Sequence, residues 1–124
     1  MDVKVVAARY VDRPKTDPAR RVFRISDHVV VDPEKLRSGR MYVGDPFRAV
    51  VITLVPGQAQ KTHMHPETDH GWFIVSGKGE LEMEIGHFET VEAGQFLVHP
   101  RNSVHGLTNH GPDNLVYVAL STGV

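Results

Sequence analysis

The sequence predicts a single all-β domain, a sandwich or barrel of antiparallel strands. At 124 residues the chain fits one domain with one sizeable core. From residue 47 onward, short runs of β-branched and apolar residues follow one another at close spacing, with turn residues between them. Almost no segment shows the 3.6-residue periodicity of an amphipathic helix. Antiparallel strands therefore account best for the chain.

The first 46 residues carry weaker signals, and we expect them to form strands and connections ahead of the main barrel at 47–120. A short strand is expected at Val3–Ala8, and a strand pair or one bent strand at Arg21–Val31. A short helical turn is expected at Glu34–Leu36, between an Asp-Pro pair that opens it and a Ser-Gly pair that ends it.

The later strands follow from the alternation of residue types. Phe47–Val55 carries apolar residues on both faces at period two, which predicts a strand covered on both sides. Glu80–Ile85 alternates acidic and apolar residues, which predicts a strand with one wet face, and Gly86 and His87 are expected to turn it into a hairpin. Further strands are expected at Gly71–Val75, Val91–Gly94, Phe96–His99, Val104–Leu107 and Leu115–Leu120.

Composition excludes several classes of function. The net charge of -1 and the pI near 6.7 argue against nucleic acid or an anionic membrane surface as partner. The chain has no cysteine, so any metal must be held by nitrogen and oxygen ligands. Without a long apolar run or a secretory signal core, a cytoplasmic protein is expected.

Three histidines crowd into eight residues, at His63, His65 and His70. Residues two apart on a strand project to the same face, so His63 and His65 aim their rings at a common point. Neutral imidazole suits zinc, iron, copper and nickel, and a set of nitrogen and oxygen ligands also suits manganese. On its own the pair is a weak signal for one divalent ion per chain, because two ordinary surface or core histidines give the same pattern.

The region from Gly57 to Asn109 resembles the two signatures of the cupin superfamily. The first signature is Gly, five residues, His, one residue, His, three or four residues, Glu, six residues, Gly; its matches are Gly57, His63, His65 and Gly77. The second is Gly, five residues, Pro, one residue, Gly, two residues, His, three residues, Asn; its matches are Gly94, Pro100, His105 and Asn109. Asn102 stands where the family usually has glycine.

The resemblance implies a cupin double-stranded β-helix, or jelly-roll β-barrel, in which His63, His65 and His105 point inward and hold a divalent metal. The family's glutamate has no counterpart, because His70 or Asp69 stands at its position, depending on the spacing. We expect His70 as the fourth ligand, since it would share a strand face with Trp72, and Asp69 as its rival. Four neutral imidazoles would leave the charge of the ion uncompensated and attract an anionic substrate.

Six further residues are weaker candidates for substrate binding. Aromatic side chains could form an apolar wall, a histidine could act beside the ion as a base, and a cation could hold a carboxylate. For most of them a structural or solvated role is the simpler interpretation. The six are Gln58, Trp72, Phe96, His99, Arg101 and Tyr117.

We therefore expect a metal-dependent small cupin enzyme, dioxygenase-like or acting by Lewis-acid chemistry on a small oxygen-rich substrate such as an enolate, diketone or carboxylate. The alternatives are a non-redox isomerase, cyclase or lyase of the same fold, and a non-catalytic cupin that binds a small molecule or a metal. A homodimer is also expected, because apolar edge strands within Arg21–Val31 would need a partner to cover them.

Overall fold

Strands dominate the computed structural model, which describes residues 3–5 and 15–122. The described elements, in chain order, are β1 (Lys4–Val5), the 3₁₀ turn η1 (Ile25–His28), β2 (Arg37–Val43), β3 (Phe47–Leu54), β4 (Ala59–Met64), β5 (His70–Ser76), β6 (Lys78–Glu84), β7 (His87–Glu92), β8 (Phe96–His99), β9 (Val104–Thr108) and β10 (Leu115–Thr122). No helix within these residues is long and apolar enough to cross a membrane.

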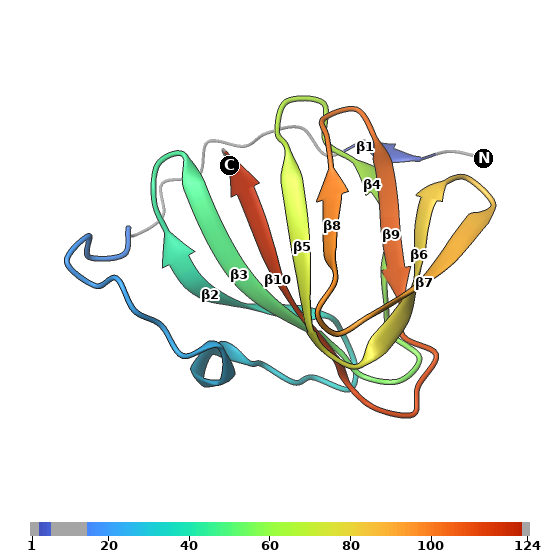
Figure 1. The fold of residues 1–124 in the computed structure, drawn as a ribbon, viewed down its shortest axis with the longest axis horizontal. Coiled ribbons are helices and arrows are strands. Elements are labelled where there is room, and N and C mark those ends of the chain that lie inside the picture. The colour runs from blue at the N-terminus through green and yellow to red at the C-terminus, as the bar shows by residue number, and fades with distance from the viewer. Residues whose placement is uncertain (1–2, 6–14, 123–124) are drawn as a thin grey trace.

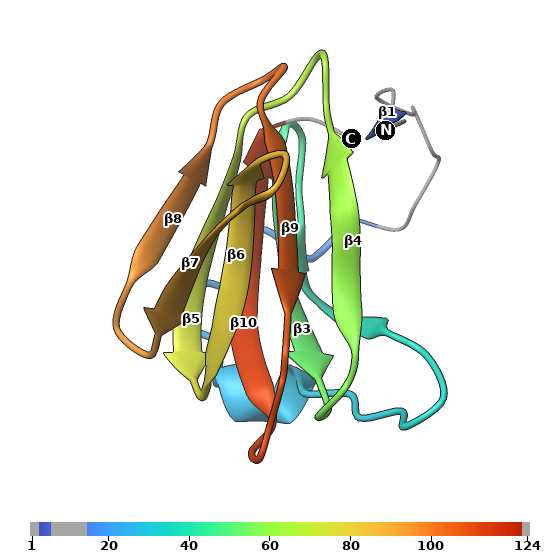
Figure 2. The ribbon, with the colours of Figure 1, turned by 90° about the vertical axis from the view of Figure 1, so that its right-hand side faces the viewer.

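The strands form two five-stranded sheets (Figure 1). One sheet has the order β1-β4-β9-β6-β7 and the other the order β2-β3-β10-β5-β8. All the pairs are antiparallel except the short parallel pair of β1 with β4. Figure 2 shows the strands of both sheets running along one common direction, with η1 near one end of the molecule. The all-β, single-domain fold predicted from the sequence is confirmed.

The main core lies between the two sheets and draws on both of them. The buried residues of this core are Ile52, Leu54, Trp72, Ile74, Leu81, Val91, Leu97, Leu107, Leu115 and Tyr117. A second cluster covers the outer face of β3 and β10, where Ala49, Val51 and Val118 pack against Ile25 and Val29 of the segment around η1. The prediction that the strand at Phe47–Val55 is covered on both sides is thus confirmed.

Pairing registers align side chains across the sheet that contains β2, β3, β10, β5 and β8. Because adjacent strands present paired residues to the same face, the inner face carries rows of side chains. One row runs through Arg48, Ser121, His70 and His99. The neighbouring row runs through Arg40, Val50, Ala119, Trp72 and Leu97.

The chain before residue 47 differs from the expectation. Arg21–Val31 contains the turn η1 between irregular flanks instead of a strand or strand pair. The reason is packing, since Ile25 and Val29 cover the outer face of the sheet without pairing to it. Of the strand expected at Val3–Ala8, Lys4–Val5 is observed as β1, and positions 6–8 lie outside the described residues.

The helical turn expected at Glu34–Leu36 is a bend instead. The carboxylate of Asp32 accepts a hydrogen bond from the backbone N–H of Glu34 at 2.9 Å, which is the local bond of an Asp turn and does not continue into a helix. Strand β2 then begins at Arg37 and passes through Gly39, which was expected to end the turn. A Cβ atom at Gly39 would overlap the carbonyl oxygen of His28, so this glycine allows a close backbone approach within a strand.

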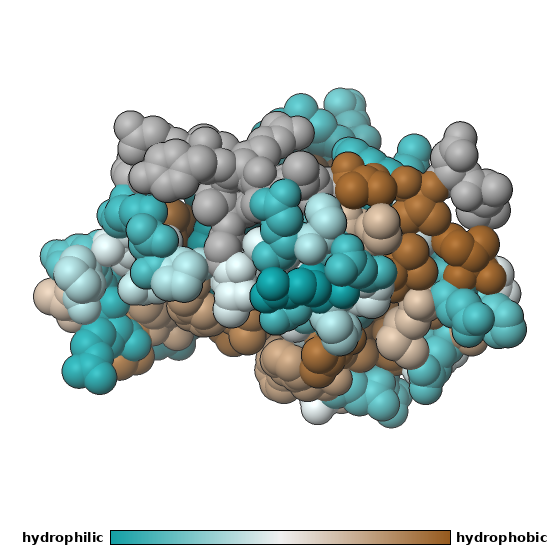
Figure 3. Space-filling model, turned by 90° about the horizontal axis from the view of Figure 1, so that it is seen from above, coloured by the Kyte–Doolittle hydropathy of each residue, from teal (hydrophilic) through white to brown (hydrophobic). Residues whose placement is uncertain are grey.

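The hairpin of β6 and β7 forms as expected around Gly86, but its apolar residues are only partly covered. Leu81 is buried, whereas Met83 and Ile85 are exposed. The hairpin lies at the edge of its sheet, where the opposite sheet does not cover its tip. Figure 3 shows hydrophobic side chains gathered on the flank over this hairpin, and Phe88 adds to the exposed apolar residues there.

Candidate metal centre

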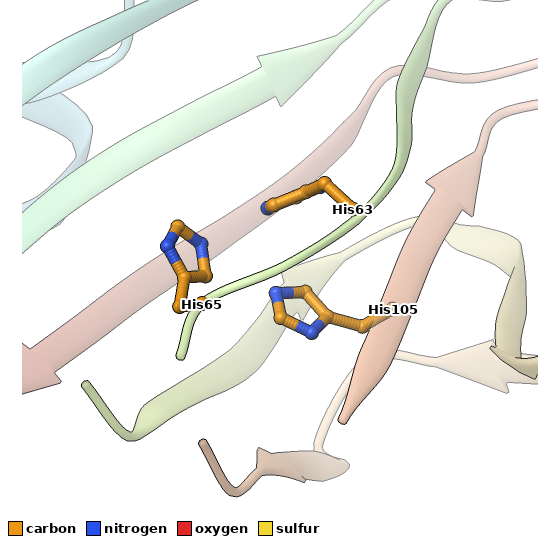
Figure 4. Close-up of side chains that lie close together, drawn as sticks. All are labelled: His63, His65 and His105. Atoms are coloured by element: carbon orange, nitrogen blue, oxygen red, sulfur yellow. The ribbon is translucent and has the colours of Figure 1, made fainter. Parts of the chain in front are cut away.

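The three histidines of the two signatures come together between the sheets. His63 and His105 are paired across β4 and β9, and His65 follows directly after the end of β4. One nitrogen from each ring can be chosen so that all three atoms lie within 4.8 Å of one another. Figure 4 shows the three rings turned toward a common point. The inward orientation that the resemblance implied is therefore present.

Hydrogen bonds set the orientation of two of the rings. The Nδ1 atom of His63 lies 2.6 Å from the carbonyl oxygen of Lys61, and the Nδ1 atom of His105 lies 3.1 Å from that of Ser103. A carbonyl oxygen only accepts, so both Nδ1 atoms carry the proton and donate. The lone pair then lies on Nε2 in both rings, as a metal ligand requires. The hydrogen bond to the carbonyl fixes the orientation of each ring, as such bonds do for metal-bound histidines.

Burial keeps these imidazoles neutral. His63 and His105 are 7% and 1% exposed. Burial lowers the pKa of His63, and burial together with the neighbouring imidazoles lowers the pKa of His105 to about 2. The Nε2 atom of His105 is buried without a hydrogen-bond partner among the described residues. A buried polar atom without a partner is costly, and a divalent ion would supply that partner, so these residues fit a metal.

His70 lies beside the three histidines, although it is not one of the group within 4.8 Å. Its ring stacks on that of His65 with centroids 3.9 Å apart, and its Nε2 atom shares a 2.8 Å hydrogen bond with the hydroxyl of Thr68. Asp69 is placed differently, because its carboxylate accepts a 2.9 Å hydrogen bond from the backbone N–H of Arg101 and pairs with that side chain. The structure thus brings His70, and not Asp69, to the histidine cluster.

Trp72, His99 and Tyr117 are buried around the cluster. The ring of His99 stacks on that of His105 with centroids 4.2 Å apart, and the ring of Trp72 contacts both imidazoles edge-on. Tyr117 is fully buried, and its hydroxyl donates to the side-chain oxygen of Gln60. Of the three, Trp72 lines the cavity described below. His99 supports the cluster from behind, and Tyr117 reaches the cavity only through the side chain that it holds.

Gln58, Phe96 and Arg101 are not among the residues that line the cavity, and their contact with a substrate stays a prediction. The amide of Gln58 closes the turn after β3, because it accepts from the N–H of Val55 and donates to the carbonyl of Asp32. Phe96 is 52% exposed on the outer side of β8, where its ring covers Gly71. Arg101 is engaged with Asp69.

The other signature residues hold the backbone around the site. Asn109 is fully buried; its amide nitrogen donates to the carbonyls of Leu54 and Asp113, and its oxygen accepts from the N–H of Gly111, each at 2.8 Å. Asn102, at the position of the family's glycine, has a φ of 68°. Asparagine is among the few residues that adopt this left-handed conformation, which explains why it can replace glycine there.

A cavity of about 610 Å³ opens beside the histidines. Its floor includes Val50, Ile52, Trp72 and Ala119. Its polar lining includes four cations that sequence reasoning did not identify, namely Lys4, Arg40, Arg48 and Lys61. The sequence offered a local signal for Arg48 alone. Arg48 lies two residues before Val50 and four before Ile52, so the three side chains share the inner face of β3. Arg40 could not be placed without knowing that β2 exists.

A fold of two facing sheets with a histidine cluster between them defines a double-stranded β-helix protein with a candidate metal centre. The family model described as "Cupin domain" matches residues 50–121. The chain therefore belongs to the cupin superfamily, as a small single-domain member. No curated protein matches the sequence.

Solved structures confirm the fold. A protein with a double-stranded beta-helix domain from Klebsiella pneumoniae is 24% identical with a TM-score of 0.79, covering 83% of this chain and 90% of that chain. KdgF from a Halomonas species is 24% identical with a TM-score of 0.71, covering 85% and 96%. A putative sugar phosphate isomerase from Acidithiobacillus ferrooxidans is 23% identical with a TM-score of 0.58, covering 63% and 51%.

Proposed function

We propose that this protein is a divalent-metal-dependent enzyme that acts on a small oxygen-rich substrate, such as an enolate, a diketone or a carboxylate. The observation that carries the proposal is the convergence of His63, His65 and His105 within 4.8 Å at the side of a cavity large enough for a small molecule. Three protein ligands leave coordination positions open for a substrate, as catalytic metal sites require.

The residues of this chain would hold the ion and orient the substrate, and the ion would act as the electrophile. His63 and His105 present Nε2 from rings fixed by the carbonyls of Lys61 and Ser103. When bound, a divalent ion supplies Lewis acidity or, if it is iron, redox chemistry with dioxygen. We retain His70 as the proposed fourth ligand in preference to Asp69, because its ring already stacks on that of His65.

The donor set favours Lewis-acid chemistry, such as isomerisation, cyclisation or lyase action. Non-haem iron oxygenases typically hold iron with two histidines and a carboxylate, and no carboxylate joins the cluster among the described residues. Three neutral imidazoles leave the double positive charge of the ion uncompensated, which strengthens its pull on a chelated oxygen. Dioxygenase-like cleavage is the second candidate, since imidazole ligands also suit iron.

A non-catalytic binding role is less well supported. An interior that is apolar apart from the metal ligands would favour such a role, whereas polar side chains such as Gln60, Arg48 and Ser121 line the cavity. Polar groups beside open coordination positions can orient and activate a substrate.

Elemental analysis of protein purified without added metal tests the proposal. We expect about one divalent ion per chain, since a preformed set of neutral ligands binds metal tightly. Restoring iron and measuring oxygen uptake with a panel of diketones and enols then separates dioxygenase from Lewis-acid chemistry. Protein that binds no divalent ion under any of these conditions would refute the proposal.

A homodimer remains a proposal, although the basis first expected for it is absent. Arg21–Val31 forms no edge strand, and its apolar residues Ile25 and Val29 pack on the chain's own sheet. The exposed apolar residues on the hairpin of β6 and β7 support association instead. The molecular mass by light scattering at micromolar concentration decides between monomer and dimer.

A further inference from the structure

We infer that the cavity binds its ligand at two points, with the ion at one side and a cationic surface opposite that holds a distal carboxylate or phosphate group of the same molecule. The cationic surface consists of Arg40 on β2 and Arg48 on β3. The inference rests on the proposed function, because the ion at the histidines supplies the first point. It adds the chemical class of the substrate, a small molecule with anionic groups at both ends.

The first support is the charge of the lining. Among the described residues that line the cavity, four carry a permanent positive charge and none is acidic. Within the described part of the chain, no ion pair neutralises Lys4, Arg40 or Lys61, since the recorded pairs join other residues outside the cavity. A concave surface of one sign attracts ligands of the opposite sign.

The second support is the position of the arginines relative to the histidines. Arg48 and His70 share one row of the inner face with Ser121 between them, so their Cα atoms are about 10 Å apart at the usual strand spacing. Arg40 begins the neighbouring row, which passes through Val50 and Ala119 before it reaches Trp72. Arg40 and Arg48 thus lie away from the histidines across the sheet, whereas Lys4 and Lys61 lie beside His63 on β1 and β4.

The third support is the floor between the two points. Val50 and Ala119 separate Arg40 from Trp72 along their row, and Ile52 adds to the same floor. Apolar side chains at this place suit an uncharged middle section of a ligand. The ligand is therefore chelating at one end, uncharged in the middle and anionic at the other end.

Electrostatics makes the two points depend on each other. A divalent ion held by neutral imidazoles adds two positive charges to a cavity that already has four. A dianionic ligand compensates both sides, so it should bind more tightly in the presence of the ion, and the ion more tightly in the presence of the ligand. Guanidinium groups can also bind a carboxylate or phosphate through two hydrogen bonds.

Calorimetric titration of the zinc-loaded protein at low ionic strength tests the inference with three probes. 2-Oxoglutarate and 2-oxopentanoate share the chelating head and the chain length, and only the former has a distal carboxylate. We expect 2-oxoglutarate to bind at least about tenfold more tightly, because the added charge-assisted hydrogen bonds are each strong. The third probe, 2-oxo-4-phosphonobutanoate, shows whether the surface prefers a carboxylate or a phosphate-like group.

Variants test whether the cationic surface causes the preference for 2-oxoglutarate over 2-oxopentanoate. Arg48→Gln should reduce the preference for 2-oxoglutarate to less than about threefold, since one charged donor is lost. Arg40→Gln, at an exposed position, should reduce it by a smaller factor and keeps the test decisive if Arg48→Gln fails to fold. Arg37→Gln is the matched control, because Arg37 pairs with Asp32 outside the cavity, and it should keep the full preference.

Three results would overturn the inference: equal affinity for the two 2-oxo acids, an unchanged preference in both cavity variants, or no binding of any probe. Zinc titration without a probe distinguishes this failure from that of the proposed function. If zinc binds and the preference is absent, only the two-point inference fails. If zinc does not bind, the proposed function fails, and the inference that rests on it falls as well.

Discussion

The histidine side of the cavity is buried and held in place, whereas the side formed by β2 and β3 is open and charged. His105 is 1% exposed, and a backbone carbonyl fixes its ring. Arg40, on the opposite side, is exposed at the end of a long flexible side chain. The difference indicates that the two sides of the cavity bind different groups. A metal ion needs ligands in one geometry before it binds, whereas a charged group of a ligand can be held by side chains that adapt to it.

The largest expected effect comes from removing the histidine side. Changing His63 and His105 together to Ala should reduce bound divalent metal from about one ion per chain to background, because the two best-oriented ligands are lost. Elemental analysis after dialysis measures this, and circular dichroism checks the fold. His87→Ala is the matched control, since His87 is exposed at the start of β7. Retention of the ion by the double variant would contradict the assignment.

A second prediction separates the scaffold from the ligands. Asn109→Ala removes three hydrogen bonds of a fully buried side chain, so it should lower the free energy of unfolding by about 3 kcal/mol. Zinc affinity of the protein that remains folded should change little, because Asn109 does not contact the histidine cluster. Urea denaturation and zinc titration measure the two effects. A large loss of zinc affinity with unchanged stability would contradict the assignment of Asn109 to the scaffold.

A third prediction concerns the position of the family's glutamate. His70→Ala should weaken zinc binding by about 10–100-fold if its ring completes the site, whether as a ligand or by supporting His65. Asp69→Asn should leave zinc affinity within about twofold, because its carboxylate is paired with Arg101 and half exposed. Isothermal titration of both variants compares them directly. A stronger effect of Asp69→Asn would make Asp69 the ligand.

A fourth prediction uses pH, because burial holds the pKa of imidazoles on the histidine side well below the usual value. Burial, followed by neighbouring charges, lowers the pKa of His70 to about 3 and that of His99 to about 4. In the unfolded chain these imidazoles take up protons near pH 6.5, and in the folded chain they do not. The metal-free protein should therefore be fully stable above about pH 7 and lose on the order of 2 kcal/mol or more by pH 5.

Urea denaturation in the presence of a chelator measures this loss. His99→Gln should make the pH dependence shallower, since one buried imidazole is removed. A flat profile between pH 7 and pH 5 would show that the imidazoles do not resist protonation.

The smallest expected effect lies at the turn between β8 and β9. Asn102 has a φ of 68°, so Asn102→Val should cost about 1 kcal/mol of stability, whereas Asn102→Gly should be neutral or slightly stabilising. Thermal unfolding of the two variants measures the difference. Equal stability of both would indicate that the turn relaxes out of the left-handed conformation.

The histidine side could be predicted from the sequence because its information is local. His63 and His65 are two residues apart in the sequence, and His105 lies in a signature with its own spacing. Local patterns of residue types likewise predicted most strands after residue 47, although β4 was not delimited and β7 begins earlier than the expected Val91–Gly94. His70 could be proposed as a neighbour of the cluster from its face alone, but its stacking on His65 depends on the turn between β4 and β5.

The cationic side could not be predicted, because sheet pairing creates it. Arg40 and Arg48 become neighbours only through the pairing of β2 with β3. The Ser-Gly pair at residues 38–39 was interpreted as a break, which concealed β2. In the structure Gly39 lies within the strand because the carbonyl of His28 approaches it closely, and such a contact between distant segments leaves no local pattern.

The central claim is that the three signature histidines hold a divalent ion, and anomalous diffraction from crystals of protein purified without added metal tests it most directly. The account predicts one anomalous peak at about 2.0–2.2 Å from the Nε2 atoms of His63 and His105, the distance usual for metal–imidazole bonds. His65 should complete the three protein ligands. Protein that is shown by elemental analysis to carry metal, but whose peak lies away from these rings, would contradict the account.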